Sequence, residues 1–531
     1  MRPRRLSEAL EDLKVRSGHS YETIGRKCHA SKSTVHRYCT GASLPLEFGI
    51  VERIGRVCGA DREELLRLHQ LWVSATSDKI PPRTEIAVPS VEVEVLAERP
   101  VRPLGLVAVL AVLTLLVAGS APSTRSQQDS VGAQQVSGPA WELPAAPVPS
   151  TLFGVTINSG TGAMPSFRVG AVRLWDSGTR WSEIERRRGE FDWSVLDRQV
   201  AGAERAGLPV LFVFGATPRW AAPGGGATPY PDGSTSAAPD DLADWERFVG
   251  AVATRYRGRI SAYELWVLAN DVRYYSGNVE TLVDMTVRAV RVIRAAAPDA
   301  TLVCPGMGRL WESDGMGFLK RFAELGGYLS CDAAGVKLFP RSGSDPPETM
   351  LTLVDAIDRT LHEAGIHPRL WNTGTTFTIA LQGALDETRA RNFAVRFYLV
   401  GLYARNQNLE RMYFYNWGGT KIPLVLQPVG GSPTPAALAV EQLQRWLNHA
   451  ESTSCGRGPA INLPEHVWEC TVTITGDRPH RASIRWTDTG TAVTSATFDV
   501  RAVHRLDGTA SAIRPGDPIT VTEEPVLVER S

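Results

Sequence analysis

The stretch VGAVRLW, residues 169–175, is a short apolar run, and WSVLDRQVAGAERAG, residues 193–207, follows it with the spacing of an amphipathic helix. Seven more apolar runs alternate with helical stretches further along the chain. They are TLFGVTI (151–157), PVLFVFG (209–215), AYELWVL (262–268), ATLVCPG (300–306), AAGVKLF (333–339), HPRLWNT (367–373) and RMYFYNW (411–417). Eight strands with helical crossovers predict an α/β TIM (β/α)8 barrel at 151–448, with a doubly wound open sheet as the alternative.

The chain as a whole is too long for one ordinary domain. Its 531 residues are 43% hydrophobic and 21% charged, a composition that permits large packed cores in three or four units. The net charge is zero, but residues 1–37 contain nine Lys and Arg against four acidic residues. This basic excess is compatible with nucleic-acid binding, although a solvated charged face is the simpler interpretation.

Residues 6–76, within a predicted domain at 1–77, show helical periodicity, and this region contains two short helical segments. SYETIGRKC (20–28) and SKSTVHRYCTG (31–41) are joined by the tight turn HAS, which predicts an all-α helix-turn-helix domain. We expect Ser20 and Ser31 to cap the two helices. A helical protein–protein module with the same core is the alternative.

The segment SYETIGRKCHASKSTVHRY resembles the Cro and phage-repressor type of DNA-binding domain, commonly called XRE-like. The resemblance implies that the second short helix enters the major groove of double-stranded DNA. Exposed residues near its start, and one residue a turn later, would contact bases, whereas the next two residues are better placed to contact phosphate. The base-contacting candidates are Lys32, Ser33, Thr34 and His36, and the phosphate-contacting candidates are Arg37 and Tyr38.

A charge-free apolar segment, LGLVAVLAVLTLLVAGSA, occupies residues 104–121. As a helix it would be about 27 Å long, enough to cross a thin bilayer. Arg99 and Arg102 precede it, so the positive-inside rule places the N-terminus in the cytoplasm and the C-terminal domains outside the cell. We therefore predict a single transmembrane helix between linkers at 78–103 and 122–150. A buried core helix and a signal-peptide segment are the alternatives, and cleavage after the span stays open.

Residues 449–531 alternate polar and apolar residues between turn signals, which predicts a small antiparallel β-sandwich. The later cysteines form two candidate disulfides. Cys304 and Cys331 belong to neighbouring predicted strands, whereas Cys455 and Cys470 flank a short stretch at the start of the sandwich. An extracellular location would permit both bonds.

Several blocks of the predicted barrel resemble the clan A glycoside hydrolases, in particular the family 39, β-xylosidase-like group. They include VRLWDSGTRWSEIERRRGEFDWSVLD (172–197) and FGATPRWAA (214–222). The resemblance implies a retaining mechanism, in which an acid/base and a nucleophilic carboxylate lie about 5–5.5 Å apart.

The sequence departs from that family at both catalytic positions. Leu268 stands where the acid/base is expected after strand four, and Gly374 where the nucleophile is expected after strand seven. Leucine cannot donate a proton and glycine has no side chain, so we predict a catalytically inactive, pseudo-glycosidase domain. A hydrolase rewired through other carboxylates is the alternative. Glu264 lies below the strand end, where we expect a buried structural acid paired with a basic residue.

The aromatic and polar residues around the strand ends nevertheless suit a saccharide, because aromatic faces pack on sugar C–H surfaces and polar groups bond hydroxyls. We expect Trp417 in particular to be exposed to the cleft. The candidate cleft residues are Arg173, Trp175, Asp176, Trp220, Asn270, Asp271, Tyr275, Asn372, Tyr415 and Trp417.

These features together predict a membrane-anchored DNA-binding regulator whose outer domain senses an oligosaccharide or polysaccharide, with no metal or cofactor. A homodimer is expected, because such heads usually read paired half-sites. The competing functions are a membrane-tethered glycoside hydrolase and a cell-surface carbohydrate-binding or structural interaction protein.

Overall fold

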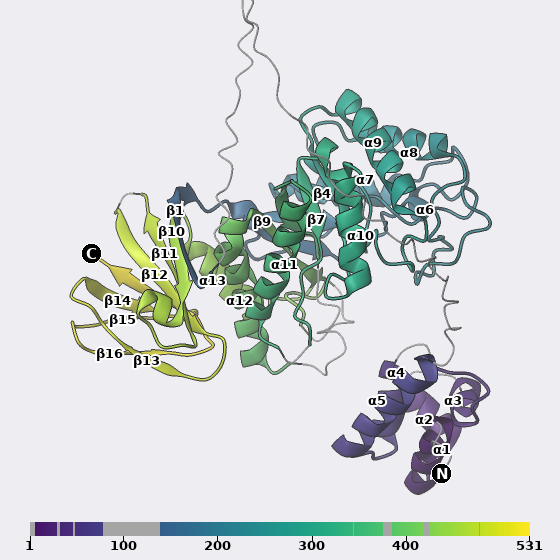
Figure 1. Cartoon of the computed structure of the whole chain (residues 1–531), viewed down its shortest axis with the longest axis horizontal. Helices are drawn as coiled ribbons and strands as arrows, with labels where there is room; N and C mark the ends of the chain where they lie inside the picture. Colours follow the sequence, from purple (N-terminus) through teal and green to yellow (C-terminus); the bar gives the residue numbers. More distant parts are fainter. Residues whose placement is uncertain are drawn as a thin grey trace, which may run out of the picture. The chain divides into compact units, whose positions relative to one another are not determined.

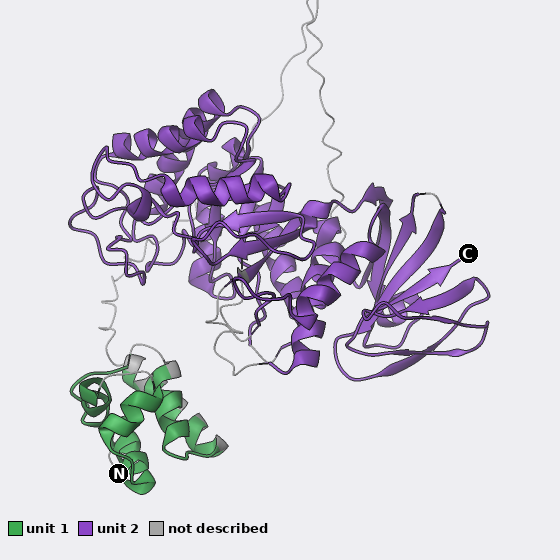
Figure 2. Cartoon of the chain, turned by 180° about the vertical axis from the view of Figure 1, so that it is seen from behind, with its two compact units in different colours: residues 1–127 green, residues 128–531 purple. Residues whose placement is uncertain are grey.

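A computed structural model describes residues 6–28, 32–45, 48–77, 138–342, 345–374, 385–418, 424–476 and 478–531. The chain forms two compact units, residues 1–127 and 128–531 (Figure 2). Across the described ranges, no helix is both long and apolar enough to cross a membrane. The predicted span 104–121 lies outside those ranges.

The described part of the first unit consists of five helices around one apolar core. They are α1 (Leu6–Ser17), α2 (Tyr21–Cys28), α3 (Lys32–Cys39), α4 (Phe48–Val57) and α5 (Arg62–Ser77). Ile24, Val35 and Ile54 are completely buried where the helices meet. Oγ of Ser20 accepts a hydrogen bond from the backbone N–H of Thr23 at 3.1 Å, as expected of a cap. The second predicted cap, Ser31, is not among the described residues.

The second unit contains a closed barrel of eight parallel strands, which rules out the open sheet. The strands are β2 (Phe153–Ile157), β3 (Ala171–Leu174), β4 (Val210–Val213), β5 (Ala262–Glu264), β6 (Thr301–Met307), β7 (Ala333–Val336), β8 (Arg369–Asn372) and β9 (Leu409–Trp417). β2 pairs with both β3 and β9 and thereby closes the barrel. Each strand overlaps one of the eight predicted apolar runs, with β6 one residue longer at its end and β9 two residues longer at its start.

Helices pack outside these strands (Figure 1). They are α6 (Trp181–Ile184), α7 (Ser194–Arg205), α8 (Leu242–Arg255), α9 (Val279–Ala296), α10 (Ser313–Glu324), α11 (Met350–Glu363), α12 (Glu387–Tyr403) and α13 (Pro435–Trp446). Inside the barrel, one layer of side chains is apolar apart from the Tyr413 hydroxyl and the indole N–H of Trp371, which donates to Glu410. It comprises Ala171, Leu211, Ala262, Val303, Ala333, Trp371 and Tyr413. This layer forms a packed floor beneath the carboxyl ends of the strands.

The tail forms antiparallel sheets, as predicted. Seven strands form one sheet in the order β1 (Ala140–Pro147), β10 (Ala450–Arg457), β11 (Val467–Ile474), β12 (His480–Thr487), β17 (Val526–Arg530), β14 (Val500–His504) and β15 (Ala510–Ala512). β13 (Ala492–Ser495) and β16 (Pro518–Val521) form a second sheet. Val467, Ile519 and Val528 lie in an apolar cluster with residues of both sheets.

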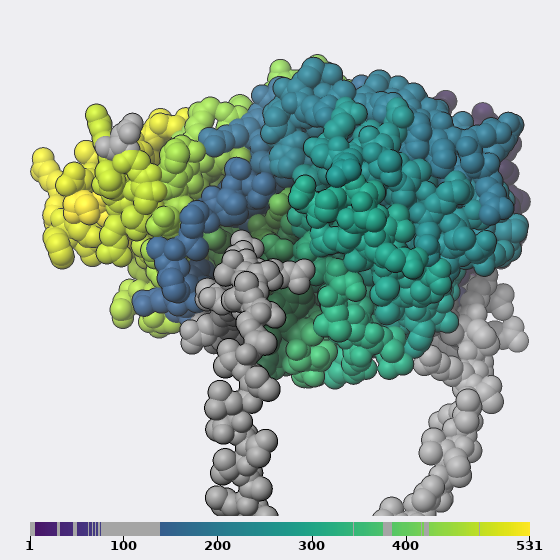
Figure 3. Space-filling model, turned by 90° about the horizontal axis from the view of Figure 1, so that it is seen from above, coloured from purple at the N-terminus to yellow at the C-terminus, as the bar shows by residue number. Residues whose placement is uncertain are grey.

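One predicted boundary is wrong, because residues 122–150 are not wholly a linker. Ala140–Pro147 form β1, which pairs with β10 at the edge of the large sheet. In Figure 3 this dark blue segment runs beside the green and yellow strands of the tail. The segment contains two prolines, which an edge strand tolerates because it leaves some backbone N–H groups unpaired.

The barrel and the tail share a buried polar junction. Nε of Arg396 on α12 donates to Oε1 of Glu348 at 2.9 Å, and Nε1 of Trp486 on β12 donates to the same oxygen at 2.7 Å. Arg396 also donates to the backbone oxygen of Asp488 at 3.0 Å. The tail is therefore fixed to the barrel by hydrogen bonds to buried charges.

Both predicted disulfides are present. Cys304 is bonded to Cys331, and Cys455 is bonded to Cys470 across the paired strands β10 and β11.

Candidate functional site

The first candidate surface is the outer side of α3. Val35 and Cys39 point into the core, so the intervening residues face outward. Lys32, Ser33, His36 and Arg37 are exposed, whereas Thr34 and Tyr38 are half-buried. The structure thus places the predicted DNA-contacting residues together on or beside one exposed helix face.

The second candidate site lies inside the barrel, one layer above the apolar floor. Glu264, at the end of β5, accepts hydrogen bonds from Nε of Arg173 at 2.8 Å, Nζ of Lys337 at 2.6 Å and Oγ1 of Thr373 at 2.8 Å. Lys337 also donates to Oγ1 of Thr373 at 2.6 Å. All four side chains are at most 6% exposed. We call these four residues the inner network.

Gly306 on β6 makes room for this network. A Cβ atom at Gly306 would overlap the Glu264 carboxylate and lie 2.9 Å from Nζ of Lys337. The prediction that Glu264 is a buried acid paired with a basic residue is confirmed.

Within the inner network, the pKa values of Glu264 and Lys337 are both lowered from their ordinary values. Burial favours the neutral form of Glu264, but the charges of Arg173 and Lys337 outweigh it and lower the pKa of the carboxyl group. Burial and the positive charge of Arg173 lower the pKa of Lys337 to about 7, against the raising effect of Glu264. One carboxylate therefore lies between two basic groups.

The two positions expected to carry catalytic carboxylates lie beside this network. Leu268 has a φ of +43° and packs against an apolar cluster that includes Trp175, Val213 and Val267. Gly374 has a φ of +116°, and a Cβ atom there would lie 3.5 Å from Nη1 of Arg173. The region after β5 is thus lined by apolar side chains, and the end of β8 faces the guanidinium group of Arg173.

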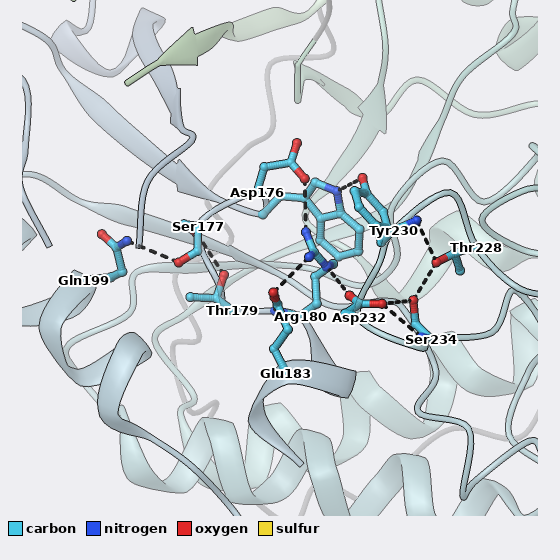
Figure 4. A network of polar contacts seen from close by, with 11 residues as sticks. Asp176, Ser177, Thr179, Arg180, Glu183, Gln199, Thr228, Tyr230, Asp232 and Ser234 are labelled. Carbon is cyan, nitrogen blue, oxygen red and sulfur yellow. Dashed lines mark hydrogen bonds and ion pairs between the residues drawn. The ribbon is translucent and has the colours of Figure 1, made fainter. Parts of the chain in front are cut away.

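A second polar cluster occupies the loops that follow β3 and β4, and Figure 4 shows Arg180 at its centre. Arg180 contacts Asp232 at 2.6 Å, Glu183 at 2.9 Å and Asp176 at 3.2 Å. Its guanidinium group also lies 4.0 Å from the ring centroid of Tyr230. We call these five residues the Arg180 cluster. Its three carboxylates bracket one cation that is itself only 7% exposed.

The Arg180 cluster reaches the neighbouring aromatic side chains. Nε1 of Trp175 donates to the Tyr230 hydroxyl at 2.7 Å, and the Tyr415 hydroxyl donates to Oδ2 of Asp176. Burial is the main cause that raises the pKa of Glu183, with Arg180 acting in the opposite direction. The predicted residues Trp175 and Tyr415 are thus bonded to members of the cluster, and the predicted residue Asp176 is itself a member.

Other predicted cleft residues are used in packing. Nδ2 of Asn270 donates to the backbone oxygen of Gly308 at 2.6 Å and thereby joins the loops after β5 and β6. Asp271 is 2% exposed and pairs with Arg273 at 2.6 Å. The Tyr275 hydroxyl donates to the backbone oxygen of Asn278.

Three more predicted cleft residues also have partners within the protein. Asn372 is completely buried, and its Oδ1 accepts from the backbone N–H of Leu338. Trp220 donates to the backbone oxygen of Glu185. Trp417 is only 1% exposed and donates to Gln427, so the expectation that it is exposed is wrong.

Sequence reasoning missed four of the five residues of the Arg180 cluster: Arg180, Glu183, Tyr230 and Asp232. Their contacts join loops about fifty residues apart, which no local pattern reveals. The available signal was an arginine shortly after a strand end, within the block DSGTRWSE. Within the described residues, no group of three or more His, Cys, Asp or Glu side chains could hold a metal ion.

Comparisons with known proteins agree with this architecture. Residues 5–68 match the family model described as a helix-turn-helix domain. A sequence search of curated proteins finds no match to the chain.

Among solved structures, the chain is similar to a family 39 glycoside hydrolase from Bacteroides cellulosilyticus WH2, with a TM-score of 0.53, 14% identity, and coverage of 72% of this chain and 81% of the other. It is also similar to a GH30 endoxylanase from Clostridium papyrosolvens C71 (TM-score 0.51, 13% identity, 74% and 100% coverage). A monomeric β-xylosidase from Caulobacter crescentus CB15 gives a TM-score of 0.50 at 12% identity, with 72% and 97% coverage. At identities this low, the structural similarity shows a shared fold alone.

Proposed function

We propose that this chain is a membrane-anchored DNA-binding regulator whose glycosidase-like barrel binds a saccharide without hydrolysing it. One observation carries the proposal: a single chain joins a helix-turn-helix domain to a glycosidase-type barrel with Leu268 and Gly374 at the ends of β5 and β8. The head supplies a DNA-binding output, and the barrel supplies a fold suited to saccharides.

The membrane placement rests on the apolar segment 104–121 and on the cysteines. Both disulfides belong to the second unit, whereas Cys28, Cys39 and Cys58 are free and buried in the first. Disulfides persist in oxidising compartments and thiols in reducing ones. This division supports a cytoplasmic head and an extracellular barrel and tail.

The loss of catalysis rests on the surroundings of the candidate carboxylates. Asp176 forms an ion pair with Arg180 and accepts a hydrogen bond from Tyr415, and Asp271 forms an ion pair with Arg273. The residue at the expected acid/base position, Leu268, packs in an apolar cluster. These contacts favour binding over a rewired hydrolysis.

The simplest coupling is through association of two chains. Bringing two heads together raises their effective concentration on paired half-sites and strengthens DNA binding without any new protein–DNA contact. We propose that saccharide binding in the barrel shifts this homodimer equilibrium.

The proposal is tested with the purified full chain on aryl glycosides and a saccharide array. We expect saccharide binding and no turnover. Turnover that Asp271→Asn or Asp176→Asn abolishes would establish a rewired hydrolase instead. An impermeant protease added to intact cells should digest the barrel and leave the head protected, and the reverse pattern would refute the orientation.

A further inference from the structure

Two polar atoms inside the barrel are buried and have no hydrogen-bond partner among the described residues. They are Nη2 of Arg173 on β3 and Oγ1 of Thr156 on the neighbouring strand β2. Arg173 is 2% exposed and Thr156 is completely buried. Buried N–H and hydroxyl groups of folded proteins nearly always have an acceptor, so both atoms call for one.

The space beside these two atoms is bounded by Gly374. A Cβ atom on Gly374 would lie 3.5 Å from Nη1 of Arg173 and 3.7 Å from Oγ1 of Thr156, which are ordinary contact distances. Because Gly374 has no side chain, the space next to the guanidinium and the hydroxyl is left open on this side. Thr156 lies on β2, Arg173 on β3, and Gly374 directly follows β8.

The charges around this space favour an anion. Arg173 and Lys337 share the single carboxylate of Glu264, which leaves one positive charge in excess whenever Lys337 is protonated. The tyrosines Tyr413 and Tyr415 also approach Arg173, but burial raises the pKa of both, and they remain neutral. The nearby carboxylate of Asp176 is already engaged by Arg180.

We propose that the pocket between Thr156, Arg173 and Gly374 binds a small monovalent anion, a carboxylate or a halide. The anion accepts hydrogen bonds from Nη2 of Arg173 and from the hydroxyl of Thr156. Its charge offsets the positive charge of Arg173 and Lys337 that the single carboxylate of Glu264 leaves unbalanced. It has two possible sources: a free anion, or the carboxylate of an acidic saccharide. Only the second source rests on the proposed function.

The test uses calorimetric titration of the purified full chain, in a buffer whose anion is a bulky sulfonate, with formate, chloride, glucuronate and glucose. Thr156→Val is the decisive variant, because it keeps the shape and removes a hydroxyl that has no hydrogen-bond partner in the described part of the chain. We expect formate affinity to fall roughly tenfold or more, with the thermal midpoint in anion-poor buffer unchanged or higher.

Thr286→Val is the matched control. Its hydroxyl is also buried but donates to the backbone oxygen of Leu282 within α9, so its formate affinity should equal that of the unaltered chain. A second readout is proton uptake. The positive charge of Arg173 is one cause of the lowered pKa of Lys337, so an anion bound to Arg173 raises that pKa from about 7. Binding at pH 8 should therefore take up protons, and the apparent heat should change with the buffer's ionisation enthalpy.

The four titrants distinguish a free anion from the carboxylate of an acidic saccharide. Formate binding without glucuronate binding identifies a free anion, and glucuronate binding that formate competes away identifies the acidic saccharide. No binding of formate, chloride or glucuronate, or equal affinities in Thr156→Val and the unaltered chain, would overturn the inference in favour of a buried water. Binding of neutral saccharides alone would overturn it and leave the proposed function standing.

Discussion

Replacing Glu264 by Gln should destabilise the barrel strongly. The change preserves the side-chain shape but removes the carboxylate that pairs with both Arg173 and Lys337. Breaking one partner out of a buried ion pair costs about 3–5 kcal/mol, because the remaining charge stays uncompensated. Three hydrogen bonds end on this carboxylate, so we expect the upper part of that range.

The effect is measured by urea unfolding of the full chain, followed by tryptophan fluorescence. All of the chain's fourteen tryptophans except Trp72 lie at residue 141 or beyond, so the signal reports the second unit. Glu204→Gln is the matched control. It breaks an exposed pair with Arg259 and should cost about 1 kcal/mol or less.

A double variant tests whether the charges of Glu264 and Lys337 compensate each other. Glu264→Gln combined with Lys337→Met removes one of the two stranded charges, so the pair should cost less than the sum of the single changes. A Glu264→Gln cost no larger than that of Glu204→Gln, or strict additivity in the double variant, would refute the claim that buried charge balance holds this layer together.

Three further predictions follow from other parts of the chain. The folded-state pKa of Lys337 is lowered from 10.5 to about 7, so between these pH values the unfolded chain binds more protons than the folded chain. The free energy of unfolding should therefore increase as pH rises from about 7 toward 10.5. Lys337→Met should remove that increase, measured by urea unfolding at several pH values. Lys32→Ala should relax the sequence preference of DNA binding, whereas Arg37→Ala should weaken all sequences alike and reduce the salt slope by about one; equal effects on specific and random duplexes in gel-shift titrations would contradict these roles. Replacing Cys304 and Cys331 together by Ala should lower the stability of the barrel by about 3 kcal/mol, as expected for a bond that spans 27 residues, and an unchanged urea midpoint would contradict this.

The barrel could be predicted from the sequence because its strands are buried on both faces. Such strands appear as continuous apolar runs, and each run overlaps an observed strand. The edge strand β1 lacks this signal. Its sequence, AWELPAAP, resembles a linker because only its pairing with β10 makes it a strand.

The site was harder to predict than the fold. The pairing of Glu264 followed from its place inside the apolar run 262–268, because a buried carboxylate needs a basic partner. The hub role of Arg180 did not follow, since its partner Asp232 lies on a separate loop. Exposure also depends on loops, and Trp417 is covered through its contact with Gln427.

The position of β1 gives the second unit a mechanical property. The described chain enters this unit through β1, so tension applied at residue 138 loads the β1–β10 ladder before it loads the barrel. The next ladder, β10–β11, is locked by the Cys455–Cys470 bond. Under a pulling force, β1 is therefore the element that detaches first, while β10 and β11 stay covalently linked to each other.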